Sequence, residues 1–236
     1  MTPQDQPATG KGAETRARIL ETSLRLFRER GYDATTMRLI AAEAGVSVGN
    51  AYYYFKSKET LIQAFYLRTH EEHLVACVEV LASEEGFEHR LLGVMDAKLR
   101  TIEPYHRFSG ILFKTAADPE SALNPFSAES LPTRRESTAL FARVIEGTEL
   151  KVSSDLWAEL PNLLWIYHMG VVLFWIHDRS EGRRRTHRLV EHTVPLISRV
   201  VRLGSLPLLR SLTRRSTAFL RELRDEIELP EASDAS

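Results

Sequence analysis

The chain has 236 residues, of which 43% are hydrophobic and 27% are charged, and its formal net charge at pH 7 is −1. This composition is typical of a globular protein with a substantial core, and the balanced charge means that any surface for nucleic acid must be local. The single cysteine, Cys77, excludes a disulfide framework within the chain and argues against a cysteine-based metal site. This cysteine usage favours a reducing, cytoplasmic compartment.

The N-terminal segment is polar and rich in proline, glycine and threonine, without the apolar stretch of a secretory signal. We expect residues 1–13 to form a flexible arm. A first helix is predicted over residues 14–30, because Ile19, Leu20, Leu24 and Phe27 recur with helical spacing. Gly31 follows this pattern, where a helix-ending residue with positive φ is common.

Two short helices and one long helix are predicted next. Thr36 is a suitable N-cap for a second helix that ends near Glu43, and Gly45 provides a turn. Ser47 is a suitable N-cap for a third short helix, and Ser57 for a long fourth helix. No stretch shows the alternating pattern of a strand, and the sequence contains no Asn-Gly or Asp-Gly hairpin turn, so we expect an all-α protein.

The remainder of the chain continues this helical pattern. Helices are predicted over residues 87–102, 104–116, 128–147, 154–178, 183–203 and 206–226, separated by glycine and proline. Pro161 lies within one of them, so we expect either a kink there or a helix start one turn later. The most apolar run, residues 163–176, holds 14 residues, whereas a membrane span needs about 20, so we expect no membrane partner.

Two short helices that are joined by a tight turn and packed against a longer helix form a helix-turn-helix unit, whose last helix lies in the DNA major groove. Three consecutive tyrosines, Tyr52 to Tyr54, cannot share one buried stripe of such a helix. A phenol can donate to a phosphate oxygen, and Asn50 can pair with adenine. We therefore predict DNA contacts for Tyr52 and Tyr53, while Tyr54 and Phe55 suit packing inside the unit equally well.

The stretch RILETSLRLFRERGYDATTMRLIAAEAGVSVGNAYYYFKSKETL closely resembles the DNA-binding region of the TetR-like (tetracycline-repressor-like) transcriptional regulators. The resemblance covers residues 15–61 and is carried by Gly31-Tyr32, Thr35-Thr36, Gly45-Val46-Ser47 and the run from Tyr52 to Lys58. It implies DNA contacts at Thr36, Arg38, Val48, Gly49, Asn50, Tyr52, Tyr53, Tyr54 and Lys58. Val48 departs from the polar or basic residue of many relatives, which implies fewer direct hydrogen bonds to bases.

The resemblance also implies a head over residues 14–60, a regulatory and dimerisation domain over 61–228, and a short tail over 229–236. The predicted helix over 154–178 is apolar on two sides, and a helix of this kind must be covered on both. We expect a second subunit to cover one side through a two-fold interface that includes the helix over 183–203. The alternative is a core formed within one chain.

An effector pocket is expected among the helices between residues 87 and 178, and its aromatic residues favour an apolar or aromatic small molecule. The candidate lining residues are Phe108, Ile111, Leu112, Phe141, Trp165, His168 and Met169. Each of them also suits plain core packing, and His168 is expected to be a hydrogen-bonded core histidine. His70 and His73 share one face of the fourth helix, but they lack a third ligand for a metal, so we expect them at the surface.

The sequence predicts a ligand-responsive, homodimeric DNA-binding regulator, with repression of a palindromic operator that a small molecule relieves. It contains no phosphate-binding glycine loop, no HExxH motif and no nucleophile elbow, so we expect neither an enzyme nor a cofactor or metal. A protein of a different class is the alternative. In that alternative, the chain is a ligand-binding or catalytic helical protein that keeps the helix-turn-helix as a scaffold.

Overall fold

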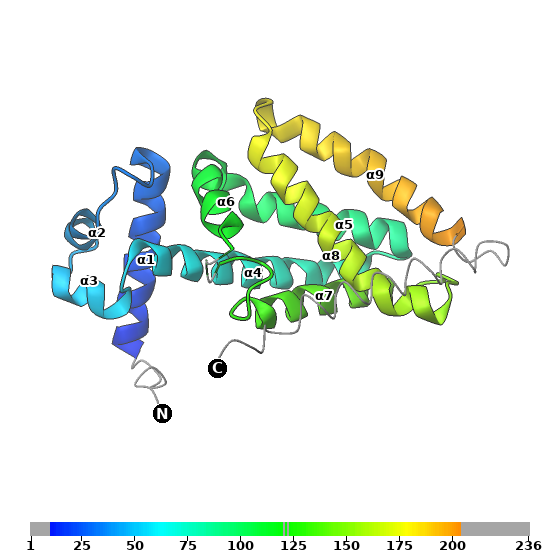
Figure 1. The fold of residues 1–236 in the computed structure, drawn as a ribbon, viewed down its shortest axis with the longest axis horizontal. Helices are drawn as coiled ribbons and strands as arrows, with labels where there is room; N and C mark the ends of the chain where they lie inside the picture. The colour runs from blue at the N-terminus through cyan, green and yellow to red at the C-terminus, as the bar shows by residue number, and fades with distance from the viewer. Residues whose placement is uncertain (1–9, 120, 122, 204–236) are drawn as a thin grey trace, which may run out of the picture. The chain divides into compact units, whose positions relative to one another are not determined.

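The computed structural model describes residues 10–119, 121 and 123–203, and every regular element in this part of the chain is a helix (Figure 1). The elements are α1 (Gly10–Arg30), α2 (Met37–Glu43), α3 (Val48–Tyr54), α4 (Lys58–Ser83), α5 (Phe87–Ile102), the 3-10 helix η1 (Glu103–Phe108), α6 (Ser109–Ala117), α7 (Leu131–Ile145), α8 (Ser154–His177), the 3-10 helix η2 (Glu181–Arg183) and α9 (Arg184–Leu203). The chain divides into two compact units. Unit 1 comprises Met1–Thr69 and Tyr105–Leu112, and unit 2 comprises His70–Pro104 and Phe113–Ser236, so α4 supplies residues to both.

Unit 1 is held together by one apolar face of α1. Ile19, Leu24 and Phe27 are buried there, and they pack in a core to which α2, α3 and the first half of α4 also contribute. Burying side chains of this size stabilises the fold by about 1.5–3 kcal/mol each. The helix ends at Arg30 because Gly31 adopts φ +84°, a left-handed conformation that side chains with a Cβ rarely take. It begins at Gly10, about one turn before the predicted start.

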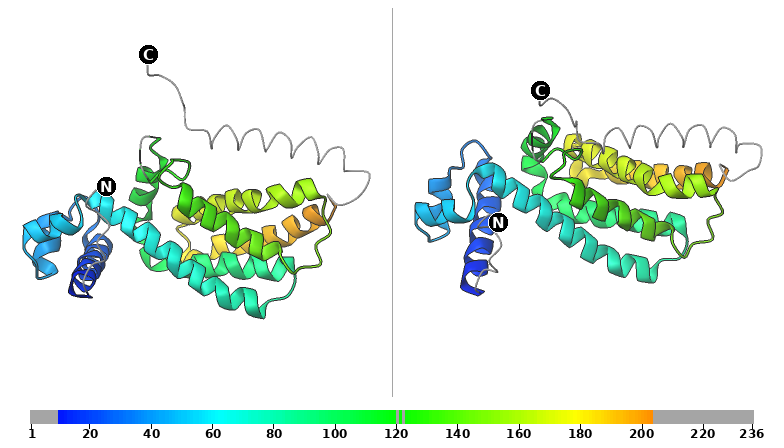
Figure 2. Two further views of the ribbon diagram at one scale, coloured as in Figure 1. Left: turned by 90° about the horizontal axis from the view of Figure 1, so that it is seen from below. Right: turned by 60° about the horizontal axis from the view of Figure 1, so that its bottom comes forward.

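Unit 2 is a bundle in which α5 contacts α7 and α9, and α8 contacts α7 and α9 (Figure 2). The core is contiguous and apolar, with Leu91, Met95, Phe141 and Val194 among its buried members. The spacing of Leu160, Leu164, Trp165, Val171 and Trp175 along α8 gives this helix one buried face. Because this face is buried against the other helices, α8 has one defined orientation in the bundle although most of its sides are apolar.

Some predicted helices need correction. The predicted helix over 104–116 is two elements, the 3-10 helix η1 and then α6. Pro104 lacks the N–H that a continuing α-helix requires, which explains why α5 ends just before it. α7 begins at Leu131 and ends before Gly147, which adopts φ +71°, so the prediction over 128–147 was too long. α8 begins at Ser154 and passes through Pro161, so the later start is wrong. The predicted helix over 206–226 lies outside the described residues.

A buried carboxylate joins α8 to α9. The Asp178 side chain accepts hydrogen bonds from the amide (2.8 Å) and hydroxyl (2.7 Å) of Ser180, and from the amide (2.9 Å) and hydroxyl (2.8 Å) of Thr186. Burial alone raises the pKa of this carboxyl, but the four hydrogen bonds outweigh burial and hold the pKa well below its usual range. The ionised carboxylate therefore stabilises the turn between the two helices.

Replacing Asp178 by alanine is expected to lower the free energy of unfolding by about 3 kcal/mol at pH 7, because four donors lose their partner. The folded-state pKa lies below the unfolded value of about 3.9, so this stabilisation is present above that pH and is lost as the pH falls toward the folded-state pKa. Urea unfolding at pH 7 and pH 3 measures both effects. Glu181→Ala, an exposed carboxylate in the same turn, is the control, and an equal loss for both variants would contradict the assignment.

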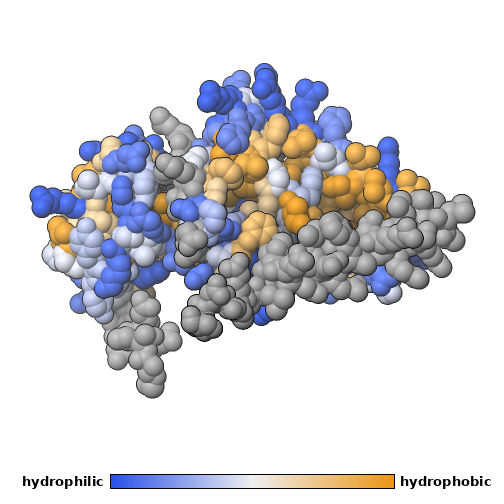
Figure 3. Space-filling view, viewed as in Figure 1, coloured by the Kyte–Doolittle hydropathy of each residue, from blue (hydrophilic) through white to orange (hydrophobic). Residues whose placement is uncertain are grey.

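An apolar surface remains open on α8 and α9. Ile166 and Phe174 on α8 and Leu196 and Val200 on α9 are exposed, and hydrophobic side chains gather over these helices in the right half of the view in Figure 3. By length and composition alone α8 could also cross a membrane, a property that it shares with core helices of other helical proteins. With its other face buried in unit 2, α8 is better explained as a core helix with an uncovered side.

Candidate nucleic-acid interface

The two short helices of unit 1 are fixed by side-chain caps and one glycine. Thr36 precedes α2, and its hydroxyl accepts a hydrogen bond from the Leu39 amide at 3.2 Å. Ser47 precedes α3 in the same way, with the Asn50 amide at 3.1 Å. Between the helices Gly45 adopts φ +65°, which reverses the chain within a few residues. The predicted N-caps and the predicted turn are thereby confirmed.

α3 presents one face to the core of unit 1 and another to solvent. Ala51 is fully buried, and Phe55, directly after the helix, is 2% exposed. In contrast Tyr52 is 45% and Tyr53 72% exposed, and Val48, Gly49 and Asn50 are also exposed. Tyr54 is half-buried, and its ring meets that of Tyr53 edge-on, with 5.1 Å between the centroids. The expectation that Tyr52 and Tyr53 point outward is confirmed, and Phe55 belongs to the core.

The N-terminus of α2 adds two more exposed side chains, Thr36 and Arg38, while Met37, Ile40 and Ala41 of the same helix are buried. The exposed amides and partial positive charge of a helix N-terminus favour an anion such as a phosphate. The face formed by Thr36, Arg38 and the exposed residues of α3 therefore combines cationic, hydroxyl and amide groups on two adjacent helices.

Two lysines beside α3 have different surroundings. The Nζ of Lys58 donates a hydrogen bond to the Tyr32 carbonyl at 2.8 Å and lies 4.0 Å from the centroid of the Tyr32 ring. The Tyr32 hydroxyl in turn donates to Glu59 at 2.9 Å. Burial and this carboxylate raise the pKa of Tyr32. Lys58, one of the DNA contacts that the resemblance implies, thus ties α4 to the loop after α1, while Lys56 is exposed to solvent.

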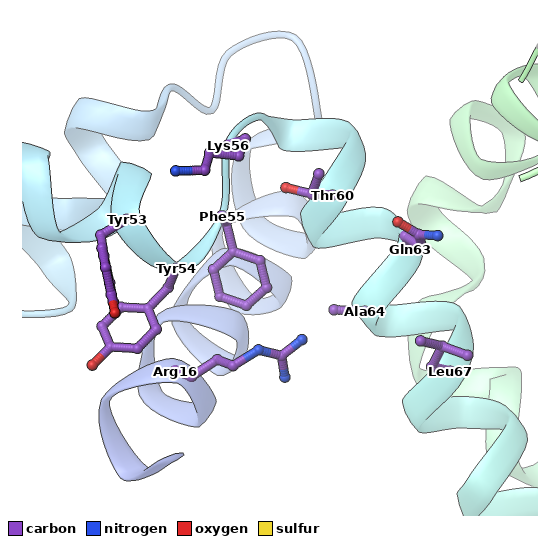
Figure 4. A pocket seen from close by; sticks show the side chains of 9 residues that line it. All are labelled: Arg16, Tyr53, Tyr54, Phe55, Lys56, Thr60, Gln63, Ala64 and Leu67. Carbon is purple, nitrogen blue, oxygen red and sulfur yellow. The ribbon is translucent and has the colours of Figure 1, made fainter. Parts of the chain in front are cut away.

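A groove of about 200 Å³ lies beside the exposed tyrosines (Figure 4). Its lining residues are Arg16, Tyr53, Tyr54, Phe55, Lys56, Thr60, Gln63, Ala64 and Leu67. The guanidinium of Arg16 lies 5.0 Å from the centroid of the Phe55 ring, and Figure 4 shows Arg16 and Lys56 on opposite sides of that ring. Arg16 is not predictable from the sequence as part of this surface, because its place beside α3 depends on how α1 packs.

Comparisons with known proteins agree with this geometry. The family described as "Bacterial regulatory proteins, tetR family" matches residues 19–65. The family described as "Tetracyclin repressor-like, C-terminal domain" matches residues 90–218, which is more than half of the chain. The chain belongs to the TetR family. The resemblance predicted from residues 15–61 is therefore confirmed, and it extends to the C-terminal half.

Individual TetR-family proteins match mainly over the DNA-binding head. The chain is 51% identical over 49 residues to the uncharacterized HTH-type transcriptional regulator YerO of Bacillus subtilis, covering 21% of this chain and 17% of that protein. It is 45% identical over 60 residues to the HTH-type transcriptional regulator TtgR of Pseudomonas putida, covering 25% of this chain and 29% of that one. The TetR transcriptional regulator from Nitrosomonas europaea has the same fold, with 17% identity, a TM-score of 0.60, and coverage of 77% of this chain and 96% of that chain.

The effector pocket that we predicted for this TetR-family chain is tested only in part. Phe141, Trp165 and His168 are buried and Met169 is half-buried in unit 2. Phe108, Ile111 and Leu112 belong to unit 1, and their side chains lie outside the described part of the structure. The pocket therefore stays a prediction. In the described part of the chain, no group of three or more His, Cys, Asp or Glu side chains is placed to hold a metal ion.

The expectation for the histidines of α4 was wrong. His70 and His73 are buried in unit 2, not at the surface. The Nε2 of His70 lies 3.0 Å from Glu136, and the Nε2 of His73 lies 3.1 Å from the Val94 carbonyl. His168 is buried as expected, but neither of its ring nitrogens has a hydrogen-bond partner among the described residues. Its interpretation as a hydrogen-bonded core histidine is therefore also wrong.

Proposed function

We propose that this TetR-family chain is a homodimeric repressor that binds a palindromic operator and is released by a small molecule. The observation that carries the proposal is the exposed face of α3, with Tyr53 at 72% and Tyr52 at 45% exposure beside Asn50. Two exposed phenol rings on a seven-residue helix contribute little to the packing of unit 1. In contact with DNA, their hydroxyls can donate to phosphates and their rings can contact base edges. Because chromosomal DNA is the partner, the protein acts in the cytoplasm.

Each proposed DNA contact follows from its chemistry. Asn50 pairs with an adenine edge, and the hydroxyls of Tyr52 and Tyr53 donate to phosphates. Thr36 and Arg38 at the N-terminus of α2 bind a phosphate of the flanking strand. Val48 and Gly49 bring the backbone of α3 close to the bases, with Val48 in contact with a thymine methyl. Tyr54 and Lys58 mainly support this surface, since Tyr54 is half-buried and Lys58 is bonded to Tyr32.

The groove beside α3 extends the proposed surface. Arg16 and Lys56 line it together with Tyr53, and both cations are exposed. A phosphodiester between them would gain two charge-assisted contacts, which is the sequence-independent part of DNA affinity. This local basic surface accounts for DNA binding by a chain whose net charge is only −1.

Dimerisation is proposed through α8 and α9. Ile166 is 53% exposed on α8 and Val200 58% exposed on α9, although both helices are otherwise packed in unit 2. A contiguous exposed apolar surface on a soluble chain marks an interaction site. A two-fold axis across this surface would form a four-helix interface, in which each copy covers the open face of the other.

The proposed mechanism of release is a shift between two dimer conformations. A dimer reads half-sites about 34 Å apart, one helical turn of DNA. An effector that binds better to a dimer whose heads have a different spacing shifts the population away from the DNA-binding form. α4 supplies residues to both units, so a change in unit 2 reaches the head along one helix. A coupling of about 1–3 kcal/mol changes operator affinity 5- to 150-fold.

Fluorescence anisotropy with labelled DNA from upstream of the protein's own gene tests the proposal, with genome-wide mapping of bound sites to find other operators. We expect a sequence-dependent complex whose affinity falls steeply as salt rises from 50 to 200 mM, because phosphate contacts release counterions. The mapped sites should contain an inverted repeat. If no salt-sensitive, sequence-dependent complex forms up to micromolar protein, the scaffold alternative replaces the regulator.

A further inference from the structure

Gly170 interrupts the exposed apolar side of α8. Ile166 and Phe174, four residues before and after it, lie on the same side of the helix and are 53% and 42% exposed. Gly170 is itself exposed, and Leu173 beside it is 39% exposed. Because glycine has no side chain, the apolar side of α8 has a depression at Gly170 between large side chains.

Packing within the described part of the chain does not explain this glycine. Gly170 lies well inside α8, and glycine in the interior of a helix weakens the helix relative to alanine. A Cβ built at Gly170 would meet no atom of another described residue within 4 Å. Gly93 inside α5 differs, because a Cβ there would lie 2.5 Å from Cγ1 of Val80. Close packing therefore accounts for Gly93, whereas Gly170 leaves room for a neighbour that the described residues do not supply.

The surface around Gly170 has the composition of an interface centre. Between residues 160 and 177, α8 contains no Asp, Glu, Lys or Arg. On α9, Leu196, Val200 and Leu203 are more than half exposed and enlarge the apolar surface (Figure 3). Charged residues are depleted in this way at the centre of protein interfaces, so a protein surface of the same apolar character is the matching partner.

A second copy of α8 fits this surface better than the C-terminal segment of the same chain. Residues 204–236 include five arginines and six acidic residues, for which the uncharged side of α8 offers no counter-charge. A two-fold axis at Gly170 instead places the depression of one helix against that of the other, with large apolar side chains on both sides. The side chains at a crossing set the distance between two helix axes, so two glycines permit a close approach.

We propose that α8 crosses α8 of a second copy of this chain at Gly170, on the two-fold axis of the dimer. This inference rests on the proposed function and adds to it the point at which the two subunits approach most closely. Ile166 and Phe174 of each subunit then pack on either side of the crossing. Val200 on α9 lies farther from the axis, in the outer part of the interface.

Disulfide crosslinking of the full chain tests this approach directly. The native Cys77 is buried, so a cysteine introduced at the surface supplies the one exposed thiol. A disulfide requires two Cα atoms about 4.4–6.8 Å apart, which a close crossing provides. After mild oxidation at micromolar concentration, we expect Gly170→Cys to form a covalent dimer at least tenfold faster than Val200→Cys or the control Val75→Cys. Equal rates for all three variants, or faster crosslinking from position 200, would overturn the proposal.

A larger side chain at position 170 gives a second, independent test. Gly170→Leu should weaken dimerisation at least 100-fold in sedimentation equilibrium, because both subunits bring the added side chain to the same point. Gly110→Leu on α6 is the matched control, since Gly110 is also exposed and a Cβ there would likewise meet nothing within 4 Å. It should leave dimerisation unchanged. A Gly170→Leu dimer as stable as the wild type would overturn the proposal.

The mass of the wild-type particle keeps this proposal separate from the proposed function. A wild-type monomer at micromolar concentration in light scattering would contradict dimerisation itself. A wild-type dimer without crosslinking at position 170 would contradict the crossing alone. Labelling Gly170→Cys with a maleimide detects the other occupant, because a monomer in which this thiol is protected would show that another part of the same chain covers α8.

Discussion

Replacing Tyr53 by alanine is expected to weaken operator binding by roughly 10- to 100-fold, because the proposed hydrogen bond to a phosphate would be lost from each subunit of the proposed dimer. The free energy of unfolding should change little. The side chain is 72% exposed, so its removal leaves no cavity, and the edge-on contact with Tyr54 contributes only about 0.5–1.5 kcal/mol. Anisotropy with labelled operator and urea unfolding of the free protein measure the two quantities.

Phe55→Ala is the matched control, because it removes another aromatic ring two residues along the chain. Phe55 is 2% exposed and lies beneath the guanidinium of Arg16. Its loss should lower the free energy of unfolding by about 3–5 kcal/mol. Tyr53→Phe then isolates the hydroxyl. If Tyr53→Ala destabilised the protein as much as Phe55→Ala, or left operator affinity unchanged, the ring would have a structural role and the proposed contact would be wrong.

Ile166→Glu is expected to convert the proposed dimer to a monomer at micromolar concentration and to reduce operator affinity about 100-fold or more. Because the interface is two-fold symmetric, each subunit places one glutamate in it. Burying an unpaired charge in an apolar interface costs several kcal/mol. Ile166 is 53% exposed in one chain, so the monomer itself should remain folded. Light scattering gives the mass of the particle, and anisotropy gives the affinity for the operator.

Val75→Glu is the control for this prediction, since it places the same charge on an apolar residue of α4 that is 72% exposed. It should leave both the mass and the operator affinity unchanged. Val200→Glu, on the facing helix α9, should repeat the effect of Ile166→Glu. A particle that keeps the mass of a dimer in both interface variants would place the subunit contact elsewhere.

The head was predictable from the sequence because its structure is determined locally. Thr36 and Ser47 cap the amides three residues later, and Gly31 and Gly45 adopt the positive φ values that end one helix and turn the chain. These signals act within a few residues of the chain, so they can be recognised without knowing which distant residues are in contact. For the same reason the outward direction of Tyr52 and Tyr53 followed from the spacing on a short helix.

The histidines of α4 were not predictable, because the stretch of α4 that contains them departs from the usual pattern of burial, although Leu61 and Phe65 earlier in the helix are buried as expected. His73 is 2% exposed, whereas the nearby Val75 is 72% exposed. Periodicity assigns the apolar residue to the core and the polar one to solvent, and only the packing of α4 against the other helices of unit 2 shows the opposite. Tertiary contacts also decide that Lys58 bonds to the Tyr32 carbonyl while Lys56 does not, and that Arg16 lies beside α3.

Photocrosslinking from position 53 tests the central claim, that the exposed face of α3 lies against DNA. The photoreactive residue p-benzoylphenylalanine would replace Tyr53 in one variant and Val75 in the other, two side chains with the same exposed fraction of 72%. We predict a covalent adduct with operator DNA from position 53 and none from position 75. Formation of the operator complex without an adduct at position 53, or with equal adducts at both positions, would contradict the account.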